Sequence, residues 1–172
     1  NKWSADFVVT HLTWKDDSLD RKKVMDLTSY TKSKFCDLAD RYKLPINIEF
    51  GGYSGHFHEP EQFVDFVKDH PLLGICIDIG HTSLISGLRN RDFYKDIEIM
   101  APYTKSIHVW NTKGMEHCKK HNHVPVHPSQ KTEDGWIDIK KALDTILSHN
   151  KNCDIVFENN HTYYDNIPDE VQ

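Results

Sequence analysis

The chain has 172 residues, of which 38% are hydrophobic and 27% are charged. This length and composition exclude a disordered chain and allow a real hydrophobic core, so we expect a single domain over residues 1–172. The formal net charge is −5, from 21 Lys plus Arg against 26 Asp plus Glu, which excludes a general attraction to nucleic acid or anionic lipid.

Targeting signals are also missing from the printed residues. Every apolar run is shorter than the roughly 20 residues that a membrane span needs, and the first residues lack the pattern of a signal peptide. The four cysteines are scattered, and two of them lie in strand-like runs in which a free thiol behaves as a small hydrophobic side chain. We therefore expect a cytoplasmic protein with no membrane partner.

Short runs of β-forming residues alternate with amphipathic helical patterns along the chain. The predicted strands, each expected to be buried on both faces, cover residues 6–10, 46–50, 74–79, 106–110 and 154–157. The predicted helices cover residues 18–42, 59–69, 93–100 and 139–149. This alternation predicts a parallel sheet with helical crossovers. The stretch 111–134 is predicted to be a long loop at one end of the sheet, and such loops are usually functional.

A residue that can bind a metal stands near the C-terminal end of every predicted strand. These residues are His11, Glu49, Asp78, His108 and Glu158. Because active sites of barrels and open α/β sheets form at that end of the strands, we expect the five side chains to converge. Three carboxylates at one place repel each other, and a divalent cation would offset the repulsion. The sequence therefore predicts a shared metal site.

Each of these residues also has a structural explanation when it is taken singly. His11 could be a surface residue at a strand end, and Glu49 could cap a loop or pair with a lysine. Asp78 could cap the helix or turn that follows it, and His81 could merely line the loop. The coincidence of five such residues at the same end of five strands favours the metal site.

The long loop adds several further candidate ligands. They are His117, Cys118, His121, His123 and His127. One cysteine among irregularly spaced histidines is a weak zinc signature. We therefore favour a single loop histidine, His123 or His127, that reaches the site at the strand ends. Trp110 could pack the loops or form a wall of the substrate site.

Five segments resemble, in this order, the strand-end motifs of the xylose isomerase-like TIM-barrel superfamily. They are INIEF, GICIDIGHTSLISG, KSIHVWN, DGWID and IVFEN. That superfamily contains sugar (phosphate) isomerases and epimerases and the endonuclease IV type of abasic-site nuclease. The resemblance implies an α/β fold, a (β/α)8 TIM barrel of which this chain supplies the five C-terminal βα units, strands 4–8. It also implies that roughly 90–100 N-terminal residues of a barrel of about 270 residues precede the chain. Barrel closure by a second chain is the alternative.

The resemblance also implies roles for individual residues. Glu49, Asp78, His108 and Glu158 would bind one divalent metal, and Glu49 and Glu158 would exchange a proton with the substrate as catalytic residues. His81 would contact the substrate, and we add His11 and Trp110 as substrate contacts. In the nuclease branch, His11, His81 and His127 would be additional metal ligands. One metal with these ligands suits Mn²⁺, Mg²⁺ or Co²⁺, whereas a multinuclear site with more histidines suits Zn²⁺.

We therefore expect a metal-dependent sugar or sugar-phosphate isomerase or epimerase of carbohydrate metabolism, acting by proton transfer through an enediolate. The first alternative is an endonuclease IV-like zinc phosphodiesterase acting on abasic DNA, against which the net charge argues. The second is a non-catalytic sugar-binding barrel. The expected partner is a small-molecule sugar or sugar phosphate rather than nucleic acid, and a homo-oligomer is left open.

Overall fold

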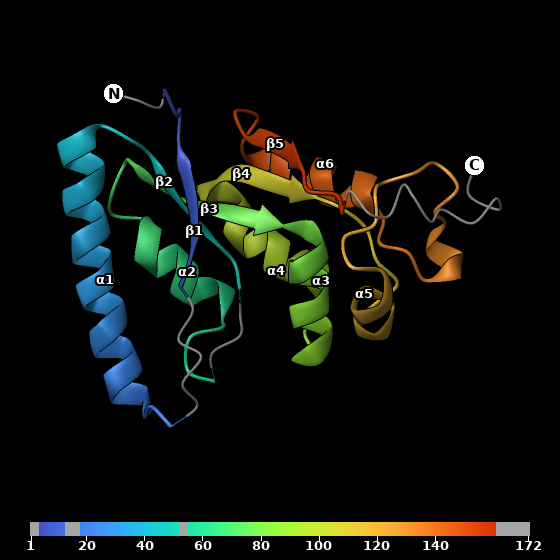
Figure 1. Cartoon of the computed structure of the whole chain (residues 1–172), viewed down its shortest axis with the longest axis horizontal. Helices are drawn as coiled ribbons and strands as arrows, with labels where there is room; N and C mark the ends of the chain where they lie inside the picture. The colour runs from blue at the N-terminus through green and yellow to red at the C-terminus, as the bar shows by residue number, and fades with distance from the viewer. Residues whose placement is uncertain (1–3, 13–17, 52–54, 161–172) are drawn as a thin grey trace.

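The computed structural model describes residues 4–12, 18–51 and 55–160, which fold around one five-stranded parallel sheet (Figure 1). The strands are β1 (Val8–His11), β2 (Ile46–Glu49), β3 (Leu73–Asp78), β4 (Thr104–Val109) and β5 (Asp154–Phe157). The helices are α1 (Arg21–Tyr42), α2 (Pro60–Val67), α3 (Ile79–Leu88), α4 (Phe93–Met100), α5 (Met115–His121) and α6 (Ile139–His149). Short 3₁₀ turns are η1 (Ala101–Tyr103) and η2 (Thr132–Asp134).

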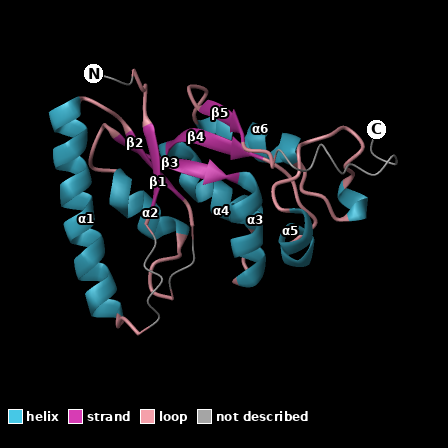
Figure 2. Cartoon of the chain, viewed as in Figure 1, coloured by secondary structure: helices cyan, strands magenta, loops and turns pink. Residues whose placement is uncertain are grey.

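The strands are arranged in the sheet in their chain order, and every neighbouring pair is parallel (Figure 2). The predicted alternation of strand and helix is therefore confirmed, and the sheet curls as part of a barrel. Two helices, α3 and α5, were not predicted. In addition, none of the helices within the described ranges has both the length and the apolar character that a membrane crossing requires.

The two faces of the sheet differ in chemistry because side chains alternate along each strand. Ile48, Ile75, Ile77 and Ile107 are fully buried and belong to the hydrophobic core. Helices α1, α2 and α4 contact β3, and α4 contacts α2, α3 and α6 (Figure 1). The intervening residues on the strands are polar or small, and they are Asn47, Glu49, Gly74, Cys76, Asp78, Ser106 and His108. The inner face is therefore polar, and it ends in the candidate site.

A glycine lets a polar bridge cross this inner face. The side-chain amide of Asn47 on β2 donates to Ser106 Oγ on β4 over a distance of 3.0 Å. The bridge passes over β3 at Gly74, the register partner of Asn47, where a Cβ would lie 2.7 Å from Asn47 Oδ1. A larger residue at Gly74 would therefore push the amide away and break the cross-strand hydrogen bond.

The two edge strands are less buried than expected. All four residues of β5 are exposed, including Ile155 at 42% and Phe157 at 66%, and Val8 on β1 is 41% exposed. The prediction that every strand is buried on both faces is thus wrong for β1 and β5, because each has a neighbouring strand on one side only. Completion of the barrel by further strands stays a prediction.

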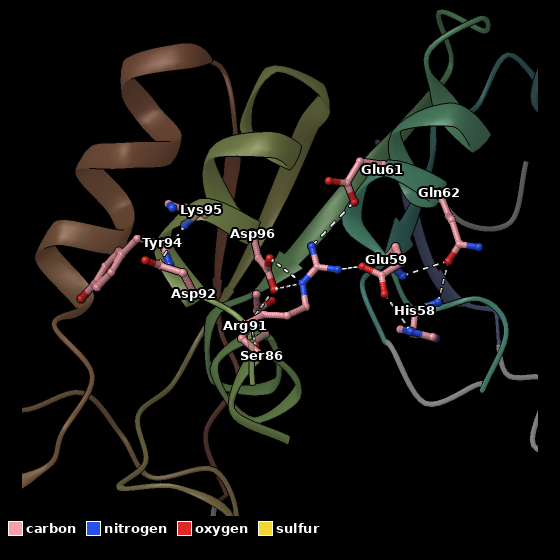
Figure 3. Close-up of polar contacts among 11 residues, drawn as sticks. His58, Glu59, Glu61, Gln62, Ser86, Arg91, Asp92, Tyr94, Lys95 and Asp96 are labelled. Carbon is pink, nitrogen blue, oxygen red and sulfur yellow. Dashed lines mark hydrogen bonds and ion pairs between the residues drawn. The ribbon is translucent and has the colours of Figure 1, made fainter. Parts of the chain in front are cut away.

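An ion-pair network with the buried Asp96 at its centre joins α2, α3 and α4 (Figure 3). Asp96, only 2% exposed, accepts from Ser86 Oγ at 2.8 Å and from Arg91 Nε at 2.9 Å. Figure 3 shows the Arg91 guanidinium between Asp96 and two glutamates of the α2 start, Glu59 and Glu61. Buried charges are tolerated only with such partners, so this network fixes the helices against one another.

We expect Asp96→Ala to lower the free energy of unfolding by about 1.5–3 kcal/mol, because hydrogen bonds to a buried charged group are lost. Urea denaturation measures the change. Asp144→Ala is the matched control, since Asp144 pairs with Lys140 on the exposed surface of α6 at 2.5 Å and should change stability little. Equal losses in the two variants would contradict a structural role for the buried network.

Candidate functional site

Asp78 ends β3 and begins α3, and its carboxylate has no exposed surface. Its Oδ1 accepts from the backbone N–H of His81 at 2.6 Å, so the carboxylate caps α3, as the structural explanation of this residue had it. Its Oδ2 accepts from the indole N–H of Trp110 at 2.8 Å. Burial raises the pKa of Asp78, and the two hydrogen bonds oppose the rise only in part. The carboxylate is therefore held rigidly, in a place that disfavours its negative charge.

His108 on β4 lies at the centre of the carboxylates. Its Nδ1 is 3.3 Å from Glu49 Oε2, 3.2 Å from Glu158 Oε2 and 3.9 Å from Asp78 Oδ2. Burial by itself would lower the pKa of His108, but contacts with Cys76, Glu158 and Glu49 raise it to about 12. The contact with His108 lowers the pKa of Glu158 to about 2. A proton on His108 is thus the positive charge that balances these carboxylates when no metal is bound.

The donor atoms fit a divalent cation. Three groups have ligand atoms that all lie within 4.8 Å of one another, and they are Glu49–Asp78–His81, Asp78–His108–Glu158 and Glu49–Cys76–His108. The buried Nδ1 of His108 has no well-aligned hydrogen-bond partner in the described part of the chain, although three carboxylates face it. Such an atom suits a metal ligand better than a structural histidine. Carboxylate oxygens together with imidazole suit Mg²⁺, Mn²⁺, Co²⁺ or Zn²⁺.

Two other predicted residues, His11 and His81, lie beside this cluster. His11 Nε2 is 3.6 Å from Glu49 Oε2, and its side chain is 51% exposed. The His81 ring lies edge to face with Trp110, with 5.0 Å between the ring centres. Burial lowers the pKa of His81, which favours a neutral imidazole that can accept a proton or bind a metal. Both residues are therefore placed where a substrate or a second ion could meet them.

The loop after β4 brings His123, and not His127, to the cluster. The His123 ring stacks on Trp110 with 4.1 Å between ring centres, and its Nδ1 is 3.9 Å from Glu158 Oε2. The described contacts of His127 lie elsewhere: its Nδ1 is 2.8 Å from Ser129 Oγ. Both histidines are candidates from the sequence, and His127 is the one selected there as the additional ligand. The sequence could not distinguish them, because the loop has no periodicity that fixes its path.

Trp110 has no exposed surface, since His123 covers one side of its ring and Gly80 approaches it closely. A side chain without exposed surface has none to offer a substrate, so the predicted substrate contact of Trp110 is corrected. Its hydrogen bond to Asp78 makes it a positioning residue for the cluster instead.

Asn111, which sequence reasoning did not select, holds the loop in place. Its backbone N–H donates to Val124 O at 2.8 Å, and its side-chain Oδ1 accepts from the backbone N–H of Ile137 at 3.1 Å. Its Nδ2 donates to Gln130 Oε1 at 2.9 Å. The buried Asn111 therefore binds three parts of the loop, two through its side chain and one through its backbone N–H. These bonds keep His123 beside Glu158. Its place directly after a predicted strand was the only signal in the sequence.

No protein-family model and no curated protein matches the chain. Among solved structures, it is similar to a D-tagatose 3-epimerase-like protein, with a TM-score of 0.64 and 19% identity over 89% of this chain and 55% of that one. It is also similar to a 3-keto-D-glucoside 4-epimerase from E. coli in its apo form, with a TM-score of 0.62 and 12% identity over 88% of this chain and 55% of that one.

These likenesses show the fold. The chain spans about half the length of the two solved structures, and its five parallel strands form a curled part of a TIM barrel. The fold that the sequence motifs predicted is therefore confirmed.

Gly80→Ala should destabilise the protein by about 1–3 kcal/mol, because the new methyl group would overlap the Trp110 ring, which has no room to move. Gly87→Ala in the same helix is the matched control. No atom lies within 4 Å of a Cβ built at Gly87, so alanine there should stabilise α3 by up to about 1 kcal/mol. Urea unfolding of both variants provides the measurement, and similar shifts would argue against the Trp110 contact.

Proposed function

We propose that the chain is the catalytic part of a divalent-metal-dependent sugar or sugar-phosphate isomerase or epimerase. Glu49, Asp78, His108 and Glu158 would hold the metal, and Mn²⁺, Mg²⁺ or Co²⁺ suits a site with these ligands. The observation that carries the proposal is the meeting of Glu49 and Glu158, from two strands separated by β3 and β4, at one nitrogen of His108. Support at the level of fold comes from the structures of the 3-keto-D-glucoside 4-epimerase and the D-tagatose 3-epimerase-like protein.

The two glutamates are suited to moving a proton on a sugar. Glu49 lies on β2 and Glu158 directly follows β5, with β3 and β4 between these strands in the sheet. A small sugar bound over the cluster would therefore have carboxylates that come from two sides of the sheet. One glutamate would take the proton from the carbon beside a carbonyl, leaving an enediolate, and the other would return a proton to a neighbouring carbon or to the opposite face. A bound divalent cation supplies Lewis-acid polarisation of the carbonyl oxygen.

The surrounding side chains have separate tasks in this proposal. In the metal-free protein, contact with His108 lowers the pKa of Glu158. In the metal-bound protein the cation would keep this carboxylate ionised, as a proton acceptor must be. Trp110 and the start of α3 fix Asp78, which keeps one ligand from rotating away. His81 and His11 lie where they can donate to or accept from sugar hydroxyls. Such preorganised contacts hold the reacting carbon near both carboxylates.

A second candidate function, zinc-dependent phosphodiester cleavage at abasic DNA, has one observation in its favour. The rings of His81 and His123 lie edge to face with 5.0 Å between their centres, beside Asp78 and Glu158. Additional imidazoles favour Zn²⁺ and a multinuclear site. The net charge of −5 argues against a DNA-binding surface, because contacts from Lys and Arg to phosphates dominate affinity for DNA.

Metal binding at this site should raise the free energy of unfolding. Mn²⁺ or Co²⁺ at about 100 times its dissociation constant should add about 2.7 kcal/mol to the free energy of unfolding, because the ion binds only the folded protein. Glu49→Gln and His108→Ala should each abolish most of this gain, as thermal unfolding with and without metal would reveal. His127→Ala is the control, since its contacts lie away from the cluster and the gain should persist.

If the gain is absent from the unsubstituted protein, the metal proposal is wrong. A gain that disappears in His127→Ala but persists in His123→Ala would show that the loop takes another path in the metal-bound protein.

The reaction itself is tested by hydrogen exchange into sugars. The whole protein with Mn²⁺ should convert a member of a ketose and ketose-phosphate panel to its epimer or aldose in D₂O, with deuterium appearing at the carbon beside the carbonyl in NMR spectra. Glu49→Gln and Glu158→Gln should each lower turnover by about 10²–10⁴-fold, because each removes one proton-transfer group. Lys140→Ala, on the exposed face of α6, is the control for unchanged turnover.

Two outcomes would overturn the isomerase proposal. Binding of a sugar by calorimetry without any turnover would favour a non-catalytic sugar-binding barrel. Zinc-dependent nicking of a duplex that carries an abasic site, without action on any sugar, would favour the phosphodiesterase.

A further inference from the structure

Two further histidines, which are not part of the carboxylate cluster, lie on α5. His117 and His121 are separated by one helical turn, and their ring centres are 4.7 Å apart with 41° between the ring planes. We infer that His117 and His121 together bind a divalent transition-metal ion of the class that prefers imidazole, such as Cu²⁺, Ni²⁺ or Zn²⁺. This site shares no ligand with the cluster of Glu49, Asp78, His108 and Glu158.

The spacing of the pair fits a shared ion. Side chains at positions i and i+4 of a helix project from the same face, and two histidines in this arrangement are a known way to bind zinc. Two imidazole nitrogens at ~2 Å from one ion place their ring centres about 4.5–5 Å apart. The observed distance of 4.7 Å between the ring centres of His117 and His121 lies in this range.

Thr112 prepares one of the two rings for binding. The buried Thr112 hydroxyl donates to Gly114 O at 3.1 Å, so its proton is already used. With that proton directed at Gly114 O, the hydroxyl oxygen can accept a hydrogen bond from His117 Nδ1, which lies 3.3 Å away. The tautomer with the hydrogen on Nδ1 leaves the lone pair on Nε2. Metal-binding histidines are commonly oriented by such a hydrogen bond from their other ring nitrogen.

Packing and charge also bear on the site. Trp136 holds the His117 ring in an edge-to-face contact, with 4.9 Å between ring centres, which limits its rotation. Burial and the nearby His121, Lys113 and Lys120 lower the pKa of His117, so its imidazole is neutral and able to bind at neutral pH. The lysine charges also repel a cation. We therefore expect the site to favour Cu²⁺ and Ni²⁺, which bind imidazole most strongly, over weakly binding ions.

The test is titration of the whole protein with Cu²⁺, beside the Glu49→Gln variant, which distinguishes binding at α5 from binding at the carboxylate cluster. Calorimetry measures the affinity, and electron paramagnetic resonance reports whether nitrogen atoms ligate the copper. His117→Ala and His121→Ala should each weaken Cu²⁺ binding by more than the ~10–100-fold that loss of an outer-shell partner costs, since each removes one of the two ligands. His149→Ala, at the end of α6, should leave the affinity unchanged.

Thr112→Val is a second variant, which keeps both imidazoles and removes only the hydroxyl. It should weaken Cu²⁺ binding less than either alanine variant does, and circular dichroism with Mg²⁺ affinity shows whether each variant has folded. Cu²⁺ affinity that is equal in His117→Ala, His121→Ala and the unsubstituted protein would overturn the inference. Cu²⁺ binding that disappears only in Glu49→Gln would also overturn it. The same holds if the protein binds inorganic phosphate instead of copper and loses that binding in His117→Ala and His121→Ala.

Discussion

The repulsion among buried carboxylates at the ends of the strands is the constraint on which the rest of the site depends. Glu49 is 4% exposed and Asp78 has no exposed surface, and Glu158 joins them at His108. Charges in such places are stable only with compensating charge or hydrogen bonds. In the metal-free protein the protonated His108 gives this compensation, and the proposed divalent cation would give it more fully. The site is therefore built to hold positive charge.

The parallel sheet creates this convergence through its register. Glu49 pairs with Cys76, and Asp78 pairs with His108, so side chains from β2, β3 and β4 point to the same inner face at neighbouring heights. Helices cover the other face with aliphatic side chains, which leaves the inner face free to be polar. Two features are not fixed by the strands alone. The hydrogen bond from Trp110 fixes the Asp78 carboxylate, and the hydrogen bonds of Asn111 fix the path of the loop.

Much of this arrangement could be predicted from the sequence because strand periodicity and strand ends are local signals. Glu49, Asp78 and His108 each end or nearly end a β-forming run, and parallel strands bring such ends together. The path of the loop after β4 could not be predicted, since it depends on distant hydrogen bonds made by Asn111. This is why His127 was preferred to His123. Helix α3 was missed because its apolar residues run on from β3, and the exposure of β5 depends on its edge position, which no local pattern reports.

Anomalous diffraction from crystals grown with Mn²⁺ would test the central claim most directly. The account predicts a single strong anomalous peak at the carboxyl ends of β2, β3 and β4, within about 2–2.5 Å of oxygens of Glu49, Asp78 and Glu158 and of a nitrogen of His108. A peak elsewhere, with these four side chains turned away from it, would contradict the account, as would crystals soaked to saturation that show no peak at all.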